Sequence, residues 1–190
     1  MAHIVIIGAG IGGLPMAFEM RENARPEDKI SVISNNANFH FVPSNPWVAV
    51  GWRDYDSITL PIAPYLEKKG IKFIADRVNK INAAANSLQL AGGTEIKYDY
   101  LVITTGPKLA FDEVPGAGPS GYTNSICTTG HAEHTYAQFK ELLENPGPVI
   151  IGAMPFASCF GPAYEFAFIL DCALRKHHKR NKIQMTFVTS

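Results

Sequence analysis

The sequence has no excess of charge of either sign: its 190 residues include 17 Lys and Arg against 17 Asp and Glu. This balance gives no indication of nucleic acid or a broad anionic surface as a partner. Three cysteines, an odd number, do not indicate the disulfide framework of a secreted domain. No apolar run reaches the ~20 residues of a transmembrane helix, and the N-terminus lacks the basic flank and apolar core of a signal peptide. We therefore expect a cytoplasmic globular protein.

The strongest motif lies at the N-terminus. Residues 3–7 form a short apolar run, which is typical of a buried strand in a parallel sheet. Gly8, Gly10 and Gly13 follow with the spacing G-x-G-x-x-G, and residues 14–23 favour a helix. In such a turn the first glycine permits the bend, the second lets a pyrophosphate approach the backbone, and the third lets helix and strand pack closely. Because helix amides would then face the phosphates, the segment predicts a dinucleotide site rather than a purely structural glycine loop.

The end of the next strand, residues 29–34, indicates which nucleotide this site favours. An NAD site usually has an acidic residue on the ribose about 20 residues after the glycine motif. Here the strand ends in Ser34, Asn35 and Asn36 instead. The neutral side chains of Ser34 or Asn35 can hydrogen-bond ribose hydroxyls. This composition weakens NAD and favours FAD as the occupant.

The whole pattern predicts an α/β fold with two dinucleotide-type domains. We expect residues 1–110 to form a Rossmann-like FAD-binding domain with a small antiparallel β insertion, which a later segment of a longer chain completes. Residues 111–190 are expected to start a second, truncated Rossmann-like domain. Residues 38–47 are rich in proline and aromatics and disfavour a long helix or a central strand. After residue 34, the expected strands are 71–75, 78–81, 87–90, 95–98, 99–107, 147–152 and 183–188. The expected helices are 61–69, 131–144 and 162–178. Gly92-Gly93 is the expected hairpin turn.

The second half repeats the strand-then-glycine pattern with changes that disfavour a nicotinamide nucleotide. In flavoproteins that take hydride from NAD(P)H, a second G-x-G-x-x-G begins at the position of Gly152. Here Met154 and Ala157 replace its second and third glycines, and Pro155 lacks an N–H that would meet a phosphate. We therefore expect the pyridine-nucleotide site to be absent or crippled. A flavoprotein with this loop needs another reductant, and Cys159 stands at the end of the loop.

Further segments establish a resemblance to a known family. Residues 98–106 resemble the second fingerprint of two-dinucleotide-domain flavoproteins, an apolar strand ending in A-T-G, with Thr104 in place of the alanine. Along its whole length the sequence resembles the sulfide:quinone oxidoreductases, flavoproteins that oxidise sulfide and reduce a membrane quinone. The segments that carry this resemblance are 41–47, 105–109, 125–128, 131–133, 152–154 and 158–165.

The resemblance implies a set of site residues and FAD as the cofactor. Redox-active cysteines of the family match Cys127 and Cys159, a polar partner matches His131, and a helix-start glutamate matches Glu165; a third family cysteine lies far downstream. No metal ligand is implied. The implied cofactor-binding residues are Gly8, Gly10, Gly12, Gly13, Ser34, Asn35, Pro43, Val78, Thr105 and Gly106.

The resemblance also implies the chemistry. Hydrosulfide attacks a disulfide or persulfide sulfur, a cysteine thiolate passes two electrons to the flavin, and the flavin reduces the quinone. A thiolate is an effective nucleophile when a base or a positive helix end lies nearby, and Cys159 precedes a predicted helix. Family members are more than twice as long as this sequence. We therefore expect the parent protein to bind the inner face of a membrane through parts absent here, with self-association left open, and the 190-residue piece alone to be inactive.

Plainer interpretations of the same residues stay open at this point. Free cysteine is among the most buried residue types, so Cys127 and Cys159 can be packing residues, and Cys172 in an apolar helical segment is interpreted as one. His131 can be a surface residue at a helix start, and Glu165 a first-turn glutamate that complements the helix dipole. The alternative functions are a type II NADH:quinone oxidoreductase and a non-catalytic flavin-binding fragment.

Overall fold

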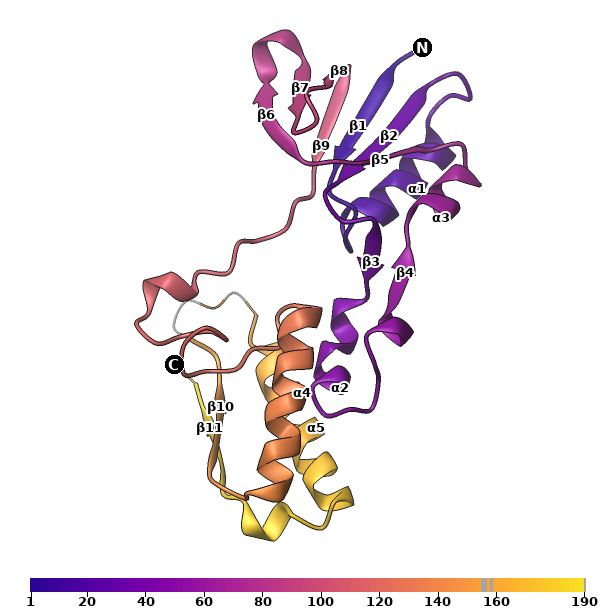
Figure 1. Cartoon of the computed structure of the whole chain (residues 1–190). Coiled ribbons are helices and arrows are strands. Elements are labelled where there is room, and N and C mark those ends of the chain that lie inside the picture. The colour runs from indigo at the N-terminus through magenta and orange to yellow at the C-terminus, as the bar shows by residue number, and fades with distance from the viewer. Residues whose placement is uncertain (155–156, 158, 190) are drawn as a thin grey trace. The chain divides into compact units, whose positions relative to one another are not determined.

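The computed structural model describes residues 1–154, 157 and 159–189 (Figure 1). The chain divides into two compact units. Unit 1 comprises Met1–His40 and Thr59–Leu109, and unit 2 comprises Phe41–Ile58 and Ala110–Ser190. Each unit has apolar clusters of its own. The chain therefore leaves unit 1 after His40, returns to it at Thr59, and leaves it again after Leu109.

Unit 1 is built on a four-stranded parallel sheet with the strand order β5-β2-β1-β9. The register pairs Ile7 with both Ile33 and Ile103, so the carboxyl ends of three strands meet at one edge. This sheet confirms the predicted Rossmann-like α/β fold. The four strands are β1 (His3–Ile7), β2 (Lys29–Ser34), β5 (Lys72–Ala75) and β9 (Tyr100–Ile103).

Both faces of this sheet are covered, which explains why its strands are continuous apolar runs. Ile4 and Ile6 pack in one cluster with residues of α1 (Gly13–Asn23) and α3 (Ala63–Glu67). Val5 and Ile7 point the other way, because successive side chains of a strand alternate between faces, and they pack against the small antiparallel sheet. Figure 1 shows the two helices and the small sheet on opposite sides of the parallel strands.

The small sheet is the predicted β insertion, with the order β6-β7-β8. The predicted hairpin turn lies between β7 and β8, where Gly93 has a φ of +84° and donates its N–H to the Leu90 carbonyl at 3.1 Å. Leu88 and Leu90 are buried and supply the packing against the main sheet. The strands are β6 (Val78–Asn82), β7 (Ser87–Leu90) and β8 (Glu95–Lys97).

The proline-rich stretch contains more structure than the sequence predicts. β3 (Asn38–His40) pairs antiparallel with β4 (Thr59–Pro61), and the chain between them forms α2 (Asn45–Val48). Pro46 lies in the first turn of α2, where a backbone N–H would have no acceptor within the helix, so proline costs no hydrogen bond there. Helix α3 is shorter than predicted, because Pro61 belongs to β4. Two 3-10 turns flank α2, η1 (Val42–Ser44) and η2 (Asp56–Ile58).

Unit 2 contains a β-α-β unit and a second long helix. β10 (Val149–Gly152) and β11 (Met185–Val188) pair in parallel and are connected through α5 (Gly161–Lys176). Four side chains of α5 are buried in the unit's core, together with Phe139 of α4 (Thr129–Glu144). Short turns complete the unit at η4 (Phe111–Glu113) and η5 (Arg180–Lys182).

One packing prediction is wrong. Cys172 is exposed on α5. The helix buries Ile169, Leu170, Ala173 and Leu174, and these four positions define a stripe that excludes position 172. Among the described residues, no helix combines the length and hydropathy needed to cross a bilayer.

Candidate functional site

The glycine turn between β1 and α1 has the geometry that its spacing predicts. Gly8 has a φ of +101°, and a Cβ there would lie 2.4 Å from the Thr104 carbonyl oxygen. A Cβ on Gly13 would lie 2.0 Å from the Gly8 carbonyl oxygen, so this position needs glycine for close packing of helix on strand. Gly10 differs, because a Cβ there would meet nothing within 4 Å. The space in front of Gly10 is therefore open to a group that approaches the backbone.

The N-terminus of α1 has no side-chain cap and no acidic residue in its first turn. Its N-cap residue is Gly12, and both Gly10 and Gly12 are exposed. An uncapped helix end of this kind presents N–H groups and the positive end of the helix dipole. With the open space at Gly10, it fits the pyrophosphate of a dinucleotide such as FAD.

The other predicted nucleotide contacts of unit 1 lie at the same edge of the sheet. Ser34 ends β2, and the exposed Asn35 follows it. Thr105 and Gly106 follow β9, both are exposed, and Gly106 has a φ of +73°. The strands are aligned here by backbone hydrogen bonds, because the Gly8 N–H donates to Ile33 and the Thr104 N–H donates to Ile7, each at 2.8 Å.

Thr104 has a role that the fingerprint comparison did not suggest. Its hydroxyl donates to the Ile7 carbonyl at 2.8 Å and lies 3.2 Å from the Gly8 carbonyl. The side chain therefore ties β9 to the start of the glycine turn, which an alanine would not do. Val78, by contrast, is half-buried at the start of β6 and packs in the apolar cluster between the two sheets. Its predicted contact with the cofactor stays a prediction.

In unit 2, Cys127 and His131 are linked through one serine. Cys127 is exposed and stands two residues before α4. Its backbone N–H donates to Ser125 Oγ at 3.1 Å, and His131 Nδ1 lies 3.2 Å from the same oxygen. Thr128 caps the helix by accepting the His131 N–H at 3.2 Å. The half-buried imidazole also contacts Phe111, with ring centroids 5.8 Å apart.

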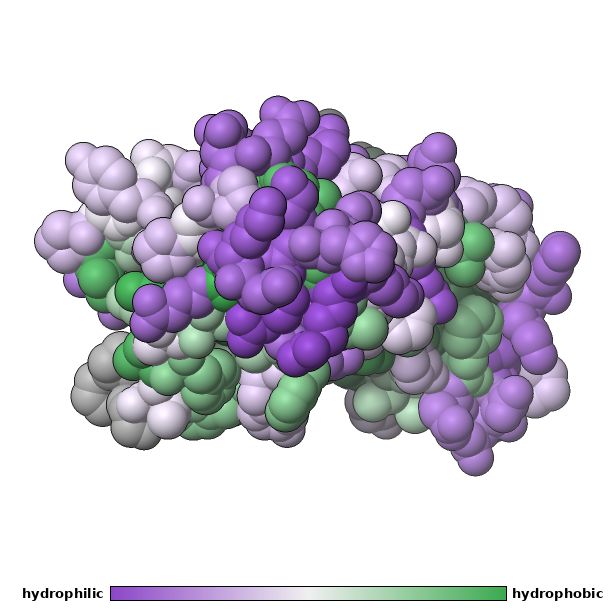
Figure 2. All heavy atoms as spheres, turned by 90° about the horizontal axis from the view of Figure 1, so that it is seen from below, coloured by the Kyte–Doolittle hydropathy of each residue, from purple (hydrophilic) through white to green (hydrophobic). Residues whose placement is uncertain are grey.

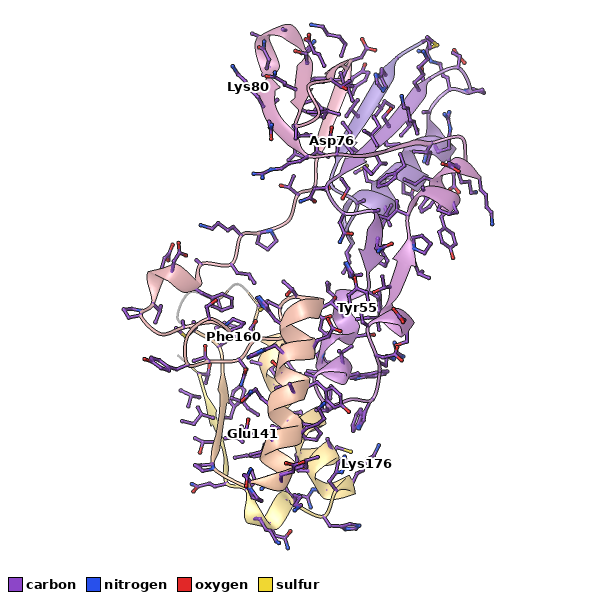
Figure 3. All side chains as sticks on the ribbon, in the orientation of Figure 1. Tyr55, Asp76, Lys80, Glu141, Phe160 and Lys176 are labelled. Carbon is purple, nitrogen blue, oxygen red and sulfur yellow. The ribbon has the colours of Figure 1, made fainter. Side chains whose placement is uncertain are left out.

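Cys159 stands in the equivalent place before α5. It is exposed, and the helix starts two residues later at Gly161. The N-cap residue, Phe160, makes no side-chain cap and is labelled at this end of the helix in Figure 3. Glu165 is exposed but lies beyond the first turn of α5, which contains no acidic residue, so its interpretation as a first-turn residue is wrong.

Two other predictions concern the loops of unit 2. Pro43 is exposed in η1. Met154 is 45% exposed after β10, at the position of the second glycine in a nucleotide-binding loop. Pro155 lies outside the described residues, so its predicted effect on this loop stays a prediction.

One buried polar residue next to the Cys127 loop is not among the predicted site residues. Asn45 is only 1% exposed. Its Nδ2 donates to the Ile126 carbonyl at 3.0 Å, and its Oδ1 accepts from Thr129 Oγ1 at 3.2 Å. A single asparagine in a proline-rich stretch has no periodicity or motif that would indicate these contacts.

Comparison with known proteins identifies the family. Residues 2–161 match the pyridine nucleotide-disulphide oxidoreductase family, so the chain belongs to this family. Over 188 residues it is 47% identical to the sulfide-quinone reductase of Aquifex aeolicus, covering 99% of this chain and 43% of that relative. The X-ray structure of the sulfide:quinone oxidoreductase from the same bacterium superposes with a TM-score of 0.92 at 46% identity, over 100% of this chain and 43% of that one.

A more distant structural relative shares the fold alone. The structure of NDH2 from Plasmodium falciparum in complex with NADH superposes with a TM-score of 0.73 at 19% identity, over 98% of this chain and 41% of that one. The present chain thus spans less than half the length of each of these relatives. The predicted fold and the predicted resemblance are confirmed.

Proposed function

We propose that this chain forms the FAD-binding N-terminal portion of a sulfide:quinone oxidoreductase. The observation that carries the proposal is the pair of exposed cysteines, Cys127 and Cys159, each two residues before a long helix of unit 2. The sequence identity to the Aquifex aeolicus sulfide-quinone reductase supports the same function. The proposed domains are an FAD-binding domain over residues 1–110 and the start of a second dinucleotide-type domain over residues 111–190.

The residues of unit 1 are suited to hold FAD. The open backbone at Gly10 and the uncapped start of α1 would bind the pyrophosphate. Ser34 or Asn35 would hydrogen-bond the ribose, and Thr105 and Gly106 would approach the nucleotide from the end of β9. When bound, FAD supplies a two-electron acceptor that can pass electrons on to a quinone.

The residues of unit 2 would carry out the sulfur chemistry. In the oxidised parent, hydrosulfide would attack Cys159 Sγ within a disulfide to a second cysteine: a new sulfur–sulfur bond forms on Cys159, the old one breaks, and the second cysteine leaves as a thiolate. The bound flavin would be the two-electron oxidant that the formation of this disulfide requires. The start of α5 favours negative charge on sulfur. His131, linked to the Cys127 backbone through Ser125, is placed to take up or return a proton, and we assign Glu165 a supporting role on α5.

The proposal includes the remaining partners of the parent protein. Sulfide is the electron donor and a membrane quinone the acceptor. Membrane contact at the inner face would come from parts outside this chain, and a homo-oligomer of the parent stays an open alternative. We propose that the 190-residue chain alone does not turn over, because it spans only 43% of the length of the Aquifex aeolicus relative.

The competing function is a type II NADH:quinone oxidoreductase. It requires a second phosphate-binding loop, and the exposed side chain of Met154 stands where a glycine backbone would need to meet the pyrophosphate. Ala157 replaces the third glycine of that loop. The other alternative, a flavin-binding fragment without catalysis, gives no reason for two exposed cysteines before helix starts.

The electron donor that reduces the flavin, sulfide or NADH, distinguishes these functions directly. We would load the full-length parent with FAD under anaerobic conditions, add sulfide and then, in a separate sample, NADH, and follow bleaching of the flavin absorbance. Rapid bleaching by sulfide and none by NADH supports the proposal. Rapid bleaching by micromolar NADH with no response to sulfide supports the type II enzyme, and no bleaching by either supports the non-catalytic fragment.

A further inference from the structure

A buried polar cluster lies directly beneath the loop that carries Cys127. The cluster comprises Asn45, Thr129 and Thr135, all of which are buried and belong to unit 2. The Thr135 hydroxyl donates to the Ser125 carbonyl at 2.9 Å, and Asn45 Nδ2 donates to the Ile126 carbonyl at 3.0 Å. Both peptide carbonyls that precede Cys127 are therefore held by buried side chains.

Asn45 is the central member of this cluster. It uses both ends of its amide, because its Oδ1 also accepts the Thr129 hydroxyl at 3.2 Å. One buried side chain thus connects α2, the Cys127 loop and the first residue of α4. A buried amide is costly to leave unpaired, so the loop has a strong preference for this position.

This arrangement leaves the thiol itself available. Cys127 is exposed while its backbone N–H is bound to Ser125 Oγ, the oxygen that also contacts His131. The loop therefore combines a held backbone with a free side chain. That combination suits a group whose sulfur must meet another sulfur in line, because exchange depends on a fixed approach geometry.

We propose that Asn45 is a positioning residue: it fixes the Cys127 loop to α2 and α4, so that the Cys127 sulfur and His131 keep one relative placement during sulfur transfer. The catalytic part of this inference rests on the proposed function. The positioning part rests only on the hydrogen bonds within unit 2, and the two parts can be tested separately.

The positioning part is tested by hydrogen exchange on the 190-residue chain. Asn45→Ala removes both hydrogen bonds, and Thr129→Val removes one. We expect the Cys127 amide to exchange at least about tenfold faster in Asn45→Ala, with a smaller increase in Thr129→Val. Thr129→Ser is the matched control, because it keeps the hydroxyl and should exchange like the wild type. Leu174→Ala, which removes packing from the apolar core between α5 and Phe139 of α4, should leave the Cys127 loop unchanged.

The catalytic part is tested with the same variants in the FAD-loaded full-length parent. We expect kcat for sulfide-dependent quinone reduction to fall about tenfold in Asn45→Ala, because a displacement of about 1 Å can cost up to a hundredfold in rate. The KM for quinone and the FAD content should stay unchanged, and Thr129→Ser should restore the rate that Thr129→Val loses.

The outcomes separate the two proposals. An unchanged exchange rate at Cys127 in both Asn45→Ala and Thr129→Val would overturn the positioning role, whatever the activity. Faster exchange throughout unit 2 would also overturn it, because Asn45 would then be a general stability residue. Faster exchange confined to the loop, in a parent that shows no sulfide activity at all, would keep the positioning role and reject the proposed function.

Discussion

At the scale of single residues, the glycines of the first turn show that one motif contains two different requirements. Gly13 is glycine because backbone atoms occupy the place of a Cβ, whereas Gly10 is glycine with empty space in front of it. The first requirement concerns folding and the second concerns a ligand. Alanine substitutions at Gly10 and Gly13, three positions apart, distinguish the two requirements.

We expect Gly10→Ala to leave the fold intact and to weaken FAD binding at least about tenfold, since its Cβ would occupy the space proposed for the pyrophosphate. Its free energy of unfolding should change by less than about 0.5 kcal/mol. Gly13→Ala should instead destabilise the chain by about 2 kcal/mol, because its Cβ clashes with the Gly8 carbonyl. Denaturant unfolding of the chain without FAD and a flavin titration measure the two effects. Equal FAD affinity in Gly10→Ala and wild type would reject this placement of the cofactor.

The exposed cysteines give a prediction about turnover. In the full-length parent, Cys159→Ala should abolish sulfide-dependent quinone reduction and leave FAD bound, because the sulfur nucleophile is lost while the phosphate site is untouched. Cys127→Ala should lower the rate. Cys172→Ala is the matched control, since Cys172 is also exposed but lies within α5. Turnover and flavin content are measured on the same preparations. Normal turnover per folded molecule in Cys159→Ala would remove this residue from the proposed mechanism.

At the scale of elements, the sequence predicts the strands and turns that produce a pattern among neighbouring residues. The strands of the main sheet are found because sheet burial on both faces produces continuous apolar runs, and the insertion is found through Gly92-Gly93. β3 and β4 are missed because they are three residues long and pair with each other across the intervening α2 segment. The role of Asn45 is missed for a similar reason: its partner Ile126 lies 81 residues away in the sequence. Local patterns cannot encode such a contact.

Asp171 of α5 forms ion pairs with Arg175 and Arg180, and this gives a pH prediction. Hydrogen bonds from Arg175 and then Arg180 hold the pKa of Asp171 below its ordinary value. The charged carboxylate therefore stabilises the folded helix at pH values above the unfolded pKa of about 4, and this contribution is lost as pH falls through the lowered pKa. Lys176, labelled in Figure 3, marks this end of the helix and stacks on Trp52.

We expect Asp171→Asn to lower the opening free energy of the α5 amides by about 1 kcal/mol at pH 7, with the difference from wild type shrinking below about pH 4. Hydrogen exchange as a function of pH measures this. Glu141→Gln, an exposed position on α4, is the control and should show little effect at either pH. A difference that persists undiminished at low pH would show that Asp171 acts through packing or shape rather than charge.

At the scale of the whole molecule, the predicted site residues divide between the two units. Unit 1 contributes the glycine turn and the ends of β2 and β9, which are the parts proposed for FAD. Unit 2 contributes Cys127, His131 and Cys159, which are proposed for sulfur chemistry, and Pro43, a predicted contact of the cofactor. The proposed function therefore needs both units. This division lets FAD binding and thiol positioning fail independently in an experiment.

The net charge of the whole chain predicts how its self-association depends on pH. Its formal net charge is zero and its isoelectric point is about 7.0, while large apolar side chains such as Ile150 and Phe168 are exposed on its surface. The face in Figure 2 shows hydrophobic areas beside strongly hydrophilic ones. Because repulsion between molecules is weakest at zero net charge, the chain should self-associate most strongly near pH 7 and less at about pH 5.5 or about pH 8.5. Static light scattering at constant ionic strength measures this.

Phe168→Glu should reduce association at pH 7 and move its maximum to lower pH, because it removes an exposed ring and adds a negative charge. Association that is independent of pH and unaffected by this variant would show that net charge does not control it.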